Sequence, residues 1–357
     1  MGEGPMGSFR IGLEETRSDR ILIQEAVSKA EESDLVLVLT ATGPEWETEG
    51  MDRKDLKLPR QQESLLERLS RAHQEKVVVF NLTGAPVEMD WALDRRLQAE
   101  LLGKEEEDCF TIPTVVQMWF PGQEGGRAMA DVLLGLGQAP ASGRMSSTWP
   151  LRIQDHASYS EDSSSFPGTI LRSTSSGGSG TSPTSVRVDY KEGKYTGYNH
   201  YLSSRSERRP LFWFGQGLGG YTRFQQRLVG TSGELTPSPG SQVVVEVEVE
   251  NLGERGGKEV IQIYSILPCS AKDRGYTKLA AFETVRLQAK ERKVVRLKLE
   301  QESFSSWQEQ AKPDGWKVDK GKYTFSLSRS SDPDSEIERF TVEVGQSWRW
   351  GGLGHLE

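Results

Sequence analysis

The first part of the chain alternates between segments with apolar residues at helical spacing and short apolar runs. Residues 20–32 predict a helix, and residues 34–40, Asp-Leu-Val-Leu-Val-Leu-Thr, predict a strand directly after it. A run that is apolar at nearly every position is typical of a parallel strand that is buried on both faces. We therefore expect this strand to lie in a sheet with both faces covered.

Two further strand–helix units follow this first one. A helix is predicted for residues 61–74, with Pro59 placed where a helix can begin, and a strand for residues 77–82. Residues 114–120 predict a third strand, and a helix with apolar residues between 128 and 134 comes after it. Three such units in series predict a doubly wound α/β layer with a mostly parallel sheet.

From about residue 236 the apolar residues recur with period two. This spacing predicts antiparallel strands with one face buried, and several short strands separated by turn residues indicate a β-sandwich. The strands expected from this pattern are residues 243–250, 259–264, 278–287, 293–299, 321–327 and 338–344. We expect the charged residues that alternate with the apolar ones, mostly Glu and Lys, to lie on the outer faces.

The segments between these two regions have other compositions. Residues 157–189 are rich in Ser, Gly and Thr, a composition that cannot bury a core and predicts a flexible loop. An aromatic-rich stretch follows at 190–224, for which inter-domain packing is the favoured interpretation. Residues 99–113 are very acidic and predict a surface insertion. The expected organisation is an α/β domain at 1–156, a connecting region at 157–235, a β-sandwich at 236–346 and a tail at 347–357.

Composition excludes several classes of function. The 357 residues carry a formal net charge of −8 with both signs well mixed, which argues against nucleic acid and anionic membranes as main partners. No apolar run approaches the roughly 18–20 residues that span a bilayer, and the N-terminal residues contain no apolar core of a signal peptide. The two cysteines, Cys109 and Cys269, do not indicate a disulfide framework. No Cys or His spacing typical of zinc is present.

One loop has an unusual density of carboxylates. Glu45, Glu47, Glu49, Asp52 and Asp55 follow the first predicted strand within a few residues. Ligands tend to bind beyond the carboxyl ends of strands in open α/β sheets. Carboxylates held close together raise one another's pKa, so that one of them can act as an acid near neutral pH. The loop is thus expected to supply the acid for an acid-catalysed hydrolysis, although a solvated surface loop is the plainer alternative.

Short motifs along nearly the whole chain carry a resemblance to a known family. The chain resembles the C-terminal half of a glycoside hydrolase family 3 β-glucosidase of the fungal and yeast type. The matching segments include Trp46-Glu-Thr-Glu-Gly-Met-Asp-Arg53, Asn81-Leu-Thr-Gly-Ala-Pro-Val-Glu88, Trp119-Phe-Pro-Gly-Gln-Glu-Gly-Gly126, Ser142-Gly-Arg144, Thr148-Trp-Pro150 and Phe214-Gly-Gln-Gly-Leu218. Their order and spacing, more than any single motif, make the match specific.

The resemblance implies a fold and a mechanism. It implies a truncated α/β sandwich followed by a fibronectin type III-like β-sandwich, and retaining hydrolysis of terminal β-linked glucose from cellobiose-like glycosides. Glu49 falls on the acid/base position of the family, with Glu47 as second choice. Asp52 and Arg53 would support the site, and Trp46 could pack against a sugar ring or anchor the core. The nucleophile would belong to a (β/α)8 barrel, which we do not find in this sequence. No cofactor or metal is implied. The compartment is left open, because the family is often secreted but some yeast-type members lack signal peptides.

Two other functions are compatible with the same sequence. The chain could be a non-catalytic sugar-binding or scaffold module, or a pseudoenzyme, because one carboxylate cannot both form and hydrolyse a glycosyl-enzyme. An adhesion protein built on the fibronectin-like domain is a weaker alternative, because that domain is small relative to the rest and has no Arg-Gly-Asp loop.

Overall fold

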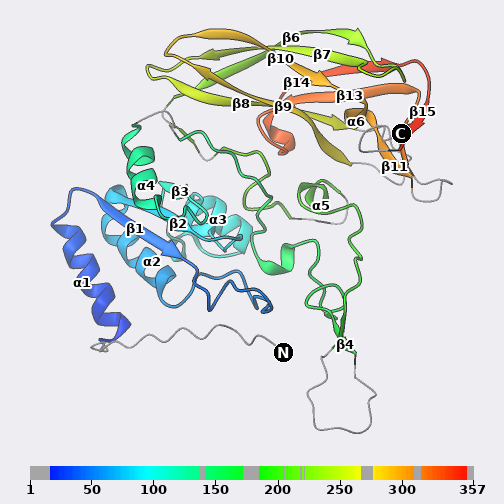
Figure 1. Cartoon of the computed structure of the whole chain (residues 1–357). Coiled ribbons are helices and arrows are strands. Elements are labelled where there is room, and N and C mark those ends of the chain that lie inside the picture. The colour runs from blue at the N-terminus through cyan, green and yellow to red at the C-terminus, as the bar shows by residue number, and fades with distance from the viewer. Residues whose placement is uncertain are drawn as a thin grey trace. The chain divides into compact units, whose positions relative to one another are not determined.

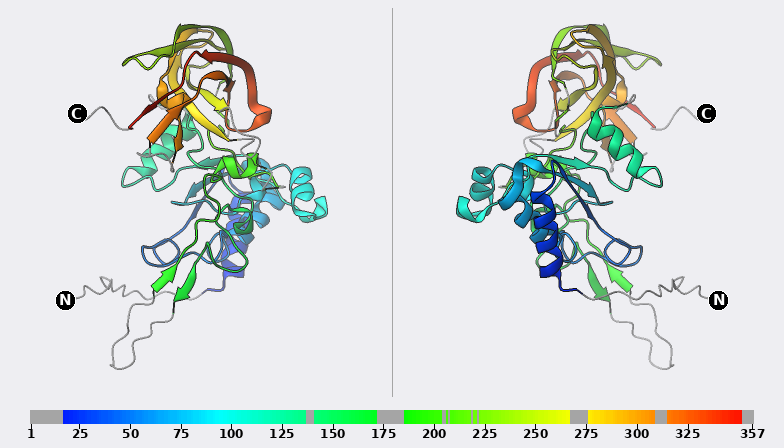
Figure 2. Two further views of the ribbon diagram at one scale, coloured as in Figure 1. Left: turned by 90° about the vertical axis from the view of Figure 1, so that its right-hand side faces the viewer. Right: turned by 90° about the vertical axis from the view of Figure 1, so that its left-hand side faces the viewer.

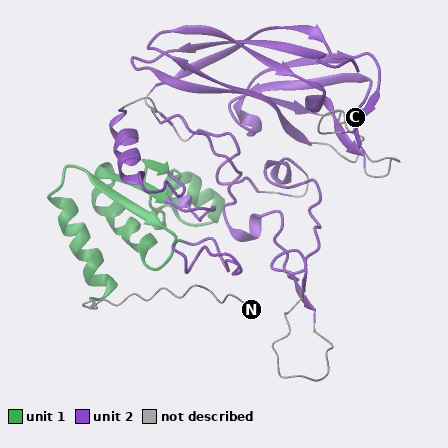
Figure 3. Ribbon diagram, viewed as in Figure 1, with its two compact units in different colours: residues 1–42, 58–81, 91–117 green, residues 43–57, 82–90, 118–357 purple. Residues whose placement is uncertain are grey.

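The computed structural model describes most of the chain and divides it into two compact units. It describes residues 17–136, 141–171, 185–203, 206, 208–217, 219–220, 222–266, 276–308 and 315–351. Unit 1 comprises Met1–Thr42, Leu58–Asn81 and Trp91–Gln117, and unit 2 comprises Gly43–Lys57, Leu82–Asp90 and Met118–Glu357 (Figure 3). Within these described ranges, no helix is both long and apolar enough to cross a bilayer.

Unit 1 is a three-stranded sheet with three helices. The strands β1 (Val36–Ala41), β2 (Val77–Leu82) and β3 (Val115–Gln117) lie in the order β1-β2-β3, and β2 pairs parallel with β3. The helices are α1 (Asp19–Glu31), α2 (Gln62–His73) and α3 (Arg95–Leu102) (Figure 1). The elements α1, β1, α2, β2 and β3, followed by α4 (Gly125–Leu134) of unit 2, confirm the predicted strand–helix series. Strand β3 is much shorter than expected, and α3 was not predicted as part of the series.

The strands of unit 1 are joined by side chains near their carboxyl ends. Asn81 is fully buried; its Oδ1 accepts a hydrogen bond from Thr40 Oγ1 at 2.8 Å, and its Nδ2 donates to Gln117 Oε1 at 2.6 Å. One residue from each strand thus contributes to a polar row across the sheet. Buried polar groups are tolerated when they are paired in this way, so the row fixes the strand ends that precede the loops.

The prediction that β1 is buried on both faces is wrong. Leu37 and Leu39 are 47% and 54% exposed, whereas Val38 and Thr40 between them are buried. The strand occupies an edge of the sheet, and its apolar residues alternate between a buried and an open face. Sequence alone could not reveal this, because an apolar residue at every position fits either arrangement.

Unit 2 contains a β-sandwich with two layers (Figures 1 and 2). One sheet has the order β10-β7-β6, and the other has the order β14-β13-β8-β9. Its strands are β6 (Phe224–Glu234), β7 (Gln242–Asn251), β8 (Gly257–Ile266), β9 (Thr277–Leu287), β10 (Arg292–Leu299), β13 (Gly321–Ser328) and β14 (Glu336–Val344). Neighbouring strands in these sheets are antiparallel. The predicted sandwich is confirmed.

Strand β7 explains why the period-two pattern was informative. Val243, Val245, Val247 and Val249 are at most 2% exposed and lie in the core, together with residues of the opposite sheet such as Phe325. The glutamates between the valines face outward and pair across the sheet; Arg296 Nε, for example, lies 2.7 Å from Glu246 Oε1. Apolar residues on one face and paired charges on the other thus fix the register of the strand.

The rest of unit 2 consists of short elements outside the sandwich. They are α4 (Gly125–Leu134), α5 (Tyr198–Leu202), α6 (Gln301–Phe304), the hairpin β4 (Thr169–Leu171) with β5 (Ser185–Arg187), and a small sheet of β11 (Ser306–Gln308), β12 (Gly315–Val318) and β15 (Trp348–Trp350). The hairpin corrects the expectation that all of 157–189 is a flexible loop. Only the described ends of that segment are covered by this correction, since residues 172–184 lie outside the described chain.

The aromatic stretch at 190–224 packs within unit 2. The ring of Tyr198 lies 5.5 Å from that of Phe214 and 6.1 Å from that of Tyr264 on β8, and Trp149 contacts both Trp119 and Phe212. Such contacts bury large apolar area at favourable ring geometries. The stretch therefore holds the sandwich against the segments that precede it.

Cys109 is a buried free thiol, and Cys269 lies outside the described residues.

A lysine on β9 makes the stability of the sandwich depend on pH. Lys278 Nζ donates to the backbone carbonyls of Glu302 and Ser305, at the end of α6. Burial lowers the pKa of Lys278 from 10.5 to about 8, although the Glu302 carboxylate opposes this shift. Between these two pH values the unfolded chain keeps a proton that the folded chain has lost, so the free energy of unfolding should rise with pH from about 8 to about 10.5.

We expect Lys278→Met to abolish this rise. The measurement is urea unfolding from neutral pH to a pH of about 10. The free energy of unfolding of the wild type minus that of the variant should increase across this range. The matched control is Lys322→Met, which changes an exposed lysine on β13 and should show no such trend. A constant difference between Lys278→Met and wild type at all pH values would contradict the assignment.

Candidate active site

Glu49 lies at the tip of a two-residue turn. Thr48 and Met51 form an antiparallel bridge, with the Met51 amide donating to the Thr48 carbonyl at 3.4 Å. Gly50 has a φ of +82°, a conformation that residues with a Cβ rarely adopt. The sequence Glu-Gly therefore suits the turn locally: glycine permits it, and the residue before glycine points outward. The Glu49 side chain is exposed, and within the described chain it makes no hydrogen bond or ion pair.

The base of this turn is held by a carboxylate clamp centred on Glu47. Glu47 Oε2 accepts a hydrogen bond from the Gly84 amide at 2.9 Å, and Glu47 Oε1 accepts one from the Ala85 amide at 3.1 Å. Arg53 Nη1 donates to Glu47 Oε1 at 3.1 Å and to the Pro86 carbonyl at 3.1 Å. The side chains of Glu47 and Arg53 are only 12% and 13% exposed. Removing either of two opposite charges that are buried together leaves the other uncompensated. The clamp therefore fixes the two ends of the turn.

The clamp is anchored in turn by the segment Leu82–Asp90. The Glu88 amide donates to the Leu56 carbonyl at 2.7 Å, just after the acidic loop. Arg152 lies 3.5 Å from the carboxylate of Glu88 and 3.1 Å from that of Asp90. The loop that carries Glu49 is therefore connected to two other segments of unit 2, so its position does not depend on its own sequence alone.

The other predicted site residues have different surroundings. Asp52 is exposed, and Trp46 is half-buried with its amide bonded to the Gly43 carbonyl at 2.8 Å. Asp55 Oδ1 accepts a hydrogen bond from the Lys57 amide at 2.9 Å, which is a local turn contact. Within the described chain, no group of three Asp, Glu, His or Cys residues could hold a metal ion.

Arg53 also lines a cavity of about 360 Å³ in unit 2. The walls are mainly apolar. They include Pro86, Thr148 and Pro150 from the family motifs, and Leu56, Ile153, His156, Tyr159 and Phe166, to which the sequence analysis assigned no role in a site. Nε and Nη2 of Arg53 and Oγ1 of Thr148 are buried without a hydrogen-bond partner in the described chain. No signal in the sequence could have assembled this set, because it unites segments that are about a hundred residues apart.

Comparison with known families now identifies the two parts of the chain. Residues 7–219 match the glycosyl hydrolase family 3 C-terminal domain. The chain belongs to glycosyl hydrolase family 3. Residues 259–331, which lie within the sandwich of unit 2, match a fibronectin type III-like domain. The resemblance drawn from the motifs is thereby confirmed, together with the expected α/β and all-β fold classes.

Individual relatives agree with this assignment. A "Beta-glucosidase" from Rhizobium radiobacter is 34% identical over 91% of this chain and 34% of its own length. A "Beta-glucosidase" from Kluyveromyces marxianus is 29% identical over 98% of this chain and 36% of its own length. A crystal structure of the Kluyveromyces enzyme superimposes with a TM-score of 0.75, at 28% identity over 95% of this chain and 34% of that chain. The chain therefore spans about a third of the length of the relatives that it matches.

A second solved structure extends the similarity to a bacterial enzyme. DesR, described as a β-glucosidase from Streptomyces venezuelae in complex with D-glucose, superimposes with a TM-score of 0.71. It is 28% identical over 91% of this chain and 35% of that chain. The fold of this chain is thus similar to solved β-glucosidases from Kluyveromyces marxianus and from Streptomyces venezuelae.

Proposed function

We propose that this chain is the acid/base-bearing part of a retaining β-glucosidase. The observation that carries the proposal is the exposed carboxylate of Glu49 on a turn whose base is locked by the clamp of Glu47, Arg53, Gly84 and Ala85. A catalytic acid has to meet a substrate and to hold its position. Glu49 meets both requirements, whereas Glu47 is already committed to backbone amides and to Arg53.

In the proposed reaction, an aspartate of a barrel domain attacks the anomeric carbon of a terminal β-linked glucose. As the bond between this carbon and the leaving oxygen breaks, Glu49 gives its proton to that oxygen. Glu49 then takes a proton from water, whose oxygen displaces the aspartate and releases glucose. Such carboxyl pairs lie about 5–5.5 Å apart, so Glu49 has to face the neighbouring domain rather than the interior of its own unit.

Similarity to known enzymes supports the substrate class. The relatives named above are described as β-glucosidases, and solved structures of the enzymes from Kluyveromyces marxianus and Thermotoga neapolitana contain glucose. The motif residues of the acidic loop occur in this chain in the order that the family resemblance requires. A cellobiose-like glycoside with a terminal β-linked glucose is accordingly the proposed substrate.

A non-catalytic sugar-binding or scaffold role is the second candidate. It rests on the residues that the structure describes: only one of their carboxylates, Glu49, has a proposed part in the reaction, and one carboxylate cannot both form and hydrolyse a glycosyl-enzyme. If no second carboxylate reaches Glu49, the covalent intermediate cannot form, and only binding or support of a neighbouring domain remains.

A chimera tests the proposed function directly. The N-terminal part of the Rhizobium radiobacter relative, fused ahead of this chain, should hydrolyse an aryl β-glucoside, while the chain by itself should not. The isolated N-terminal part is the control. A chimera that binds glucose without turnover would favour the non-catalytic role, and turnover by the chain alone would refute the need for a second domain.

A further inference from the structure

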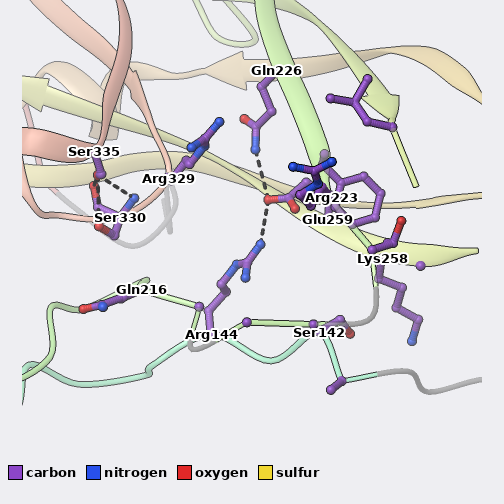
Figure 4. A pocket seen from close by; sticks show the side chains of 18 of the residues that line it. Ser142, Arg144, Gln216, Arg223, Gln226, Lys258, Glu259, Arg329, Ser330 and Ser335 are labelled. Atoms are coloured by element: carbon purple, nitrogen blue, oxygen red, sulfur yellow. Dashed lines mark hydrogen bonds and ion pairs between the residues drawn. The ribbon is translucent and has the colours of Figure 1, made fainter. Parts of the chain in front are cut away.

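Unit 2 contains a second, larger cavity of about 740 Å³ beside the sandwich. Its walls come from the segments around Ser142 and Gly217, from strands β6 and β8, and from the turn after β13 (Figure 4). The lining consists of charged, hydroxyl and glycine residues with few apolar side chains. This composition differs from that of the cavity at Arg53, and it fits a polar ligand.

A buried carboxylate lies at the centre of this cavity. Glu259 on β8 is 6% exposed, and its Oε1 accepts hydrogen bonds from Arg144 Nη2 at 2.7 Å and from Gln226 Nε2 at 3.0 Å (Figure 4). The Arg144 guanidinium lies directly against the Cα of Gly217, so that any side chain there would collide with it. Arg144 and Glu259 are thus locked together and neutralise each other.

The second carboxylate of the lining, Asp332, is also engaged by an arginine. Asp332 accepts hydrogen bonds from Arg209 Nη2 at 2.8 and 3.0 Å, and Arg209 also pairs with Asp334 at 3.0 Å. Both acidic side chains of the lining are therefore engaged by arginines. Arg209 serves two carboxylates, so the lining together with Arg209 and Asp334 has five cations against three carboxylates and keeps an excess of positive charge.

Three cations of the lining remain without a carboxylate. Arg223, Lys258 and Arg329 form no ion pair within the described parts of the chain. In Figure 4, Arg223 and Arg329 lie on either side of the line from Gln226 through Glu259 to Arg144. An excess of positive charge around a concave surface raises the local concentration of anions, and the planar fork of arginine matches the oxygen atoms of a phosphate.

We propose that this cavity binds a dianionic phosphate group carried by a small polar molecule, such as a sugar phosphate. The volume exceeds what a bare ion needs and lies in the usual range for small-molecule sites, roughly 300–1,000 Å³. Ser142, Gln216 and Thr222 line the same space and offer hydroxyl and amide groups for the uncharged part. The site is separate from Glu49, and its occupation does not depend on the proposed hydrolysis.

The test uses the chain itself with inorganic phosphate and glucose 6-phosphate as probes. At low ionic strength, each probe should raise the Tm of the chain above its value in sodium chloride of equal ionic strength. Glucose 6-phosphate should do so at a lower concentration than inorganic phosphate. Glucose alone should not raise the Tm. Calorimetric titration of the double variant Arg223→Gln with Arg329→Gln should give at least tenfold weaker binding, about 1.4 kcal/mol. Both side chains are exposed, so the fold should be retained.

The matched control is Arg296→Gln, an exposed arginine on the outer face of the sandwich that pairs with Glu246. It should bind both probes as the wild type does. Equal binding by the control, the double variant and the wild type would overturn the proposal, as would a chloride effect equal to that of phosphate. Since exposed charges are screened by salt, added sodium chloride should weaken the binding progressively.

Discussion

Glu49→Gln should lower the kcat/KM of the chimera, which reports the first step, by about 10²–10⁴-fold on β-glucosides with poor leaving groups, the usual contribution of a general acid. Glutamine keeps the shape of the side chain but cannot give a proton to the departing oxygen. The decrease in the rate of the first step should be smaller for aryl glucosides whose phenol is acidic, because such a phenolate leaves without protonation. The measurement is a series of aryl β-glucosides of graded leaving-group pKa, compared between the variant and the parent chimera.

Glu45→Gln is the control, because Glu45 is also exposed in the acidic loop and has no proposed role. Its rates should match those of the parent chimera. If Glu49→Gln showed the same loss at every leaving-group pKa, the residue would act by positioning and not by proton transfer. If it showed no loss at all, the acid/base assignment of Glu49 would be wrong.

The sequence was most informative where one physical requirement dominates. Strand β7 has to bury one face and solvate the other, so its Val–Glu alternation determines both the strand and its orientation. Helix α2 was predictable for the same reason at helical spacing. Strand β1 was predicted as a strand correctly, but its burial was not, because the residues that cover or expose a face lie elsewhere in the chain.

Short and irregular elements gave less signal. The hairpin of β4 and β5 has three residues in each strand and is separated by a Ser- and Gly-rich segment. Three residues are too few for a reliable period, so composition outweighed the pattern. In the predicted strand 114–120, Trp119 has a φ of +56°, which ends the extended backbone early, and no residue preference foretells that conformation for tryptophan.

The candidate site divides in the same way. The turn that presents Glu49 is local, and Glu-Gly within a motif was sufficient to mark it. The role of Glu47 depends on amides 37 and 38 residues away, so sequence reasoning could only rank it as a second carboxylate. The basic cavity is still less accessible to such reasoning, because Arg144 and Glu259 are 115 residues apart and belong to different parts of unit 2.

Glu47→Ala should destabilise unit 2 by about 2–4 kcal/mol, because it leaves the buried guanidinium of Arg53 and two backbone amides without their acceptor. Denaturation by urea, monitored by tryptophan fluorescence, measures this loss. Glu47→Gln should recover part of it, since one amide oxygen can still accept from Gly84 or Ala85. Glu106→Ala, an exposed carboxylate outside the loop, should change stability little.

The same variant separates positioning from chemistry. Under conditions where it stays folded, the chimera with Glu47→Ala should have a lower kcat than the parent but the same dependence of rate on leaving-group pKa. The reason is that Glu49 still gives the proton, but from a turn that is no longer held in place. A steeper dependence, like that expected for Glu49→Gln, would instead make Glu47 the proton donor and Glu49 the bystander. The clamp would then be a feature of the resting structure, opening when substrate binds, and the order of the two candidate residues would be reversed.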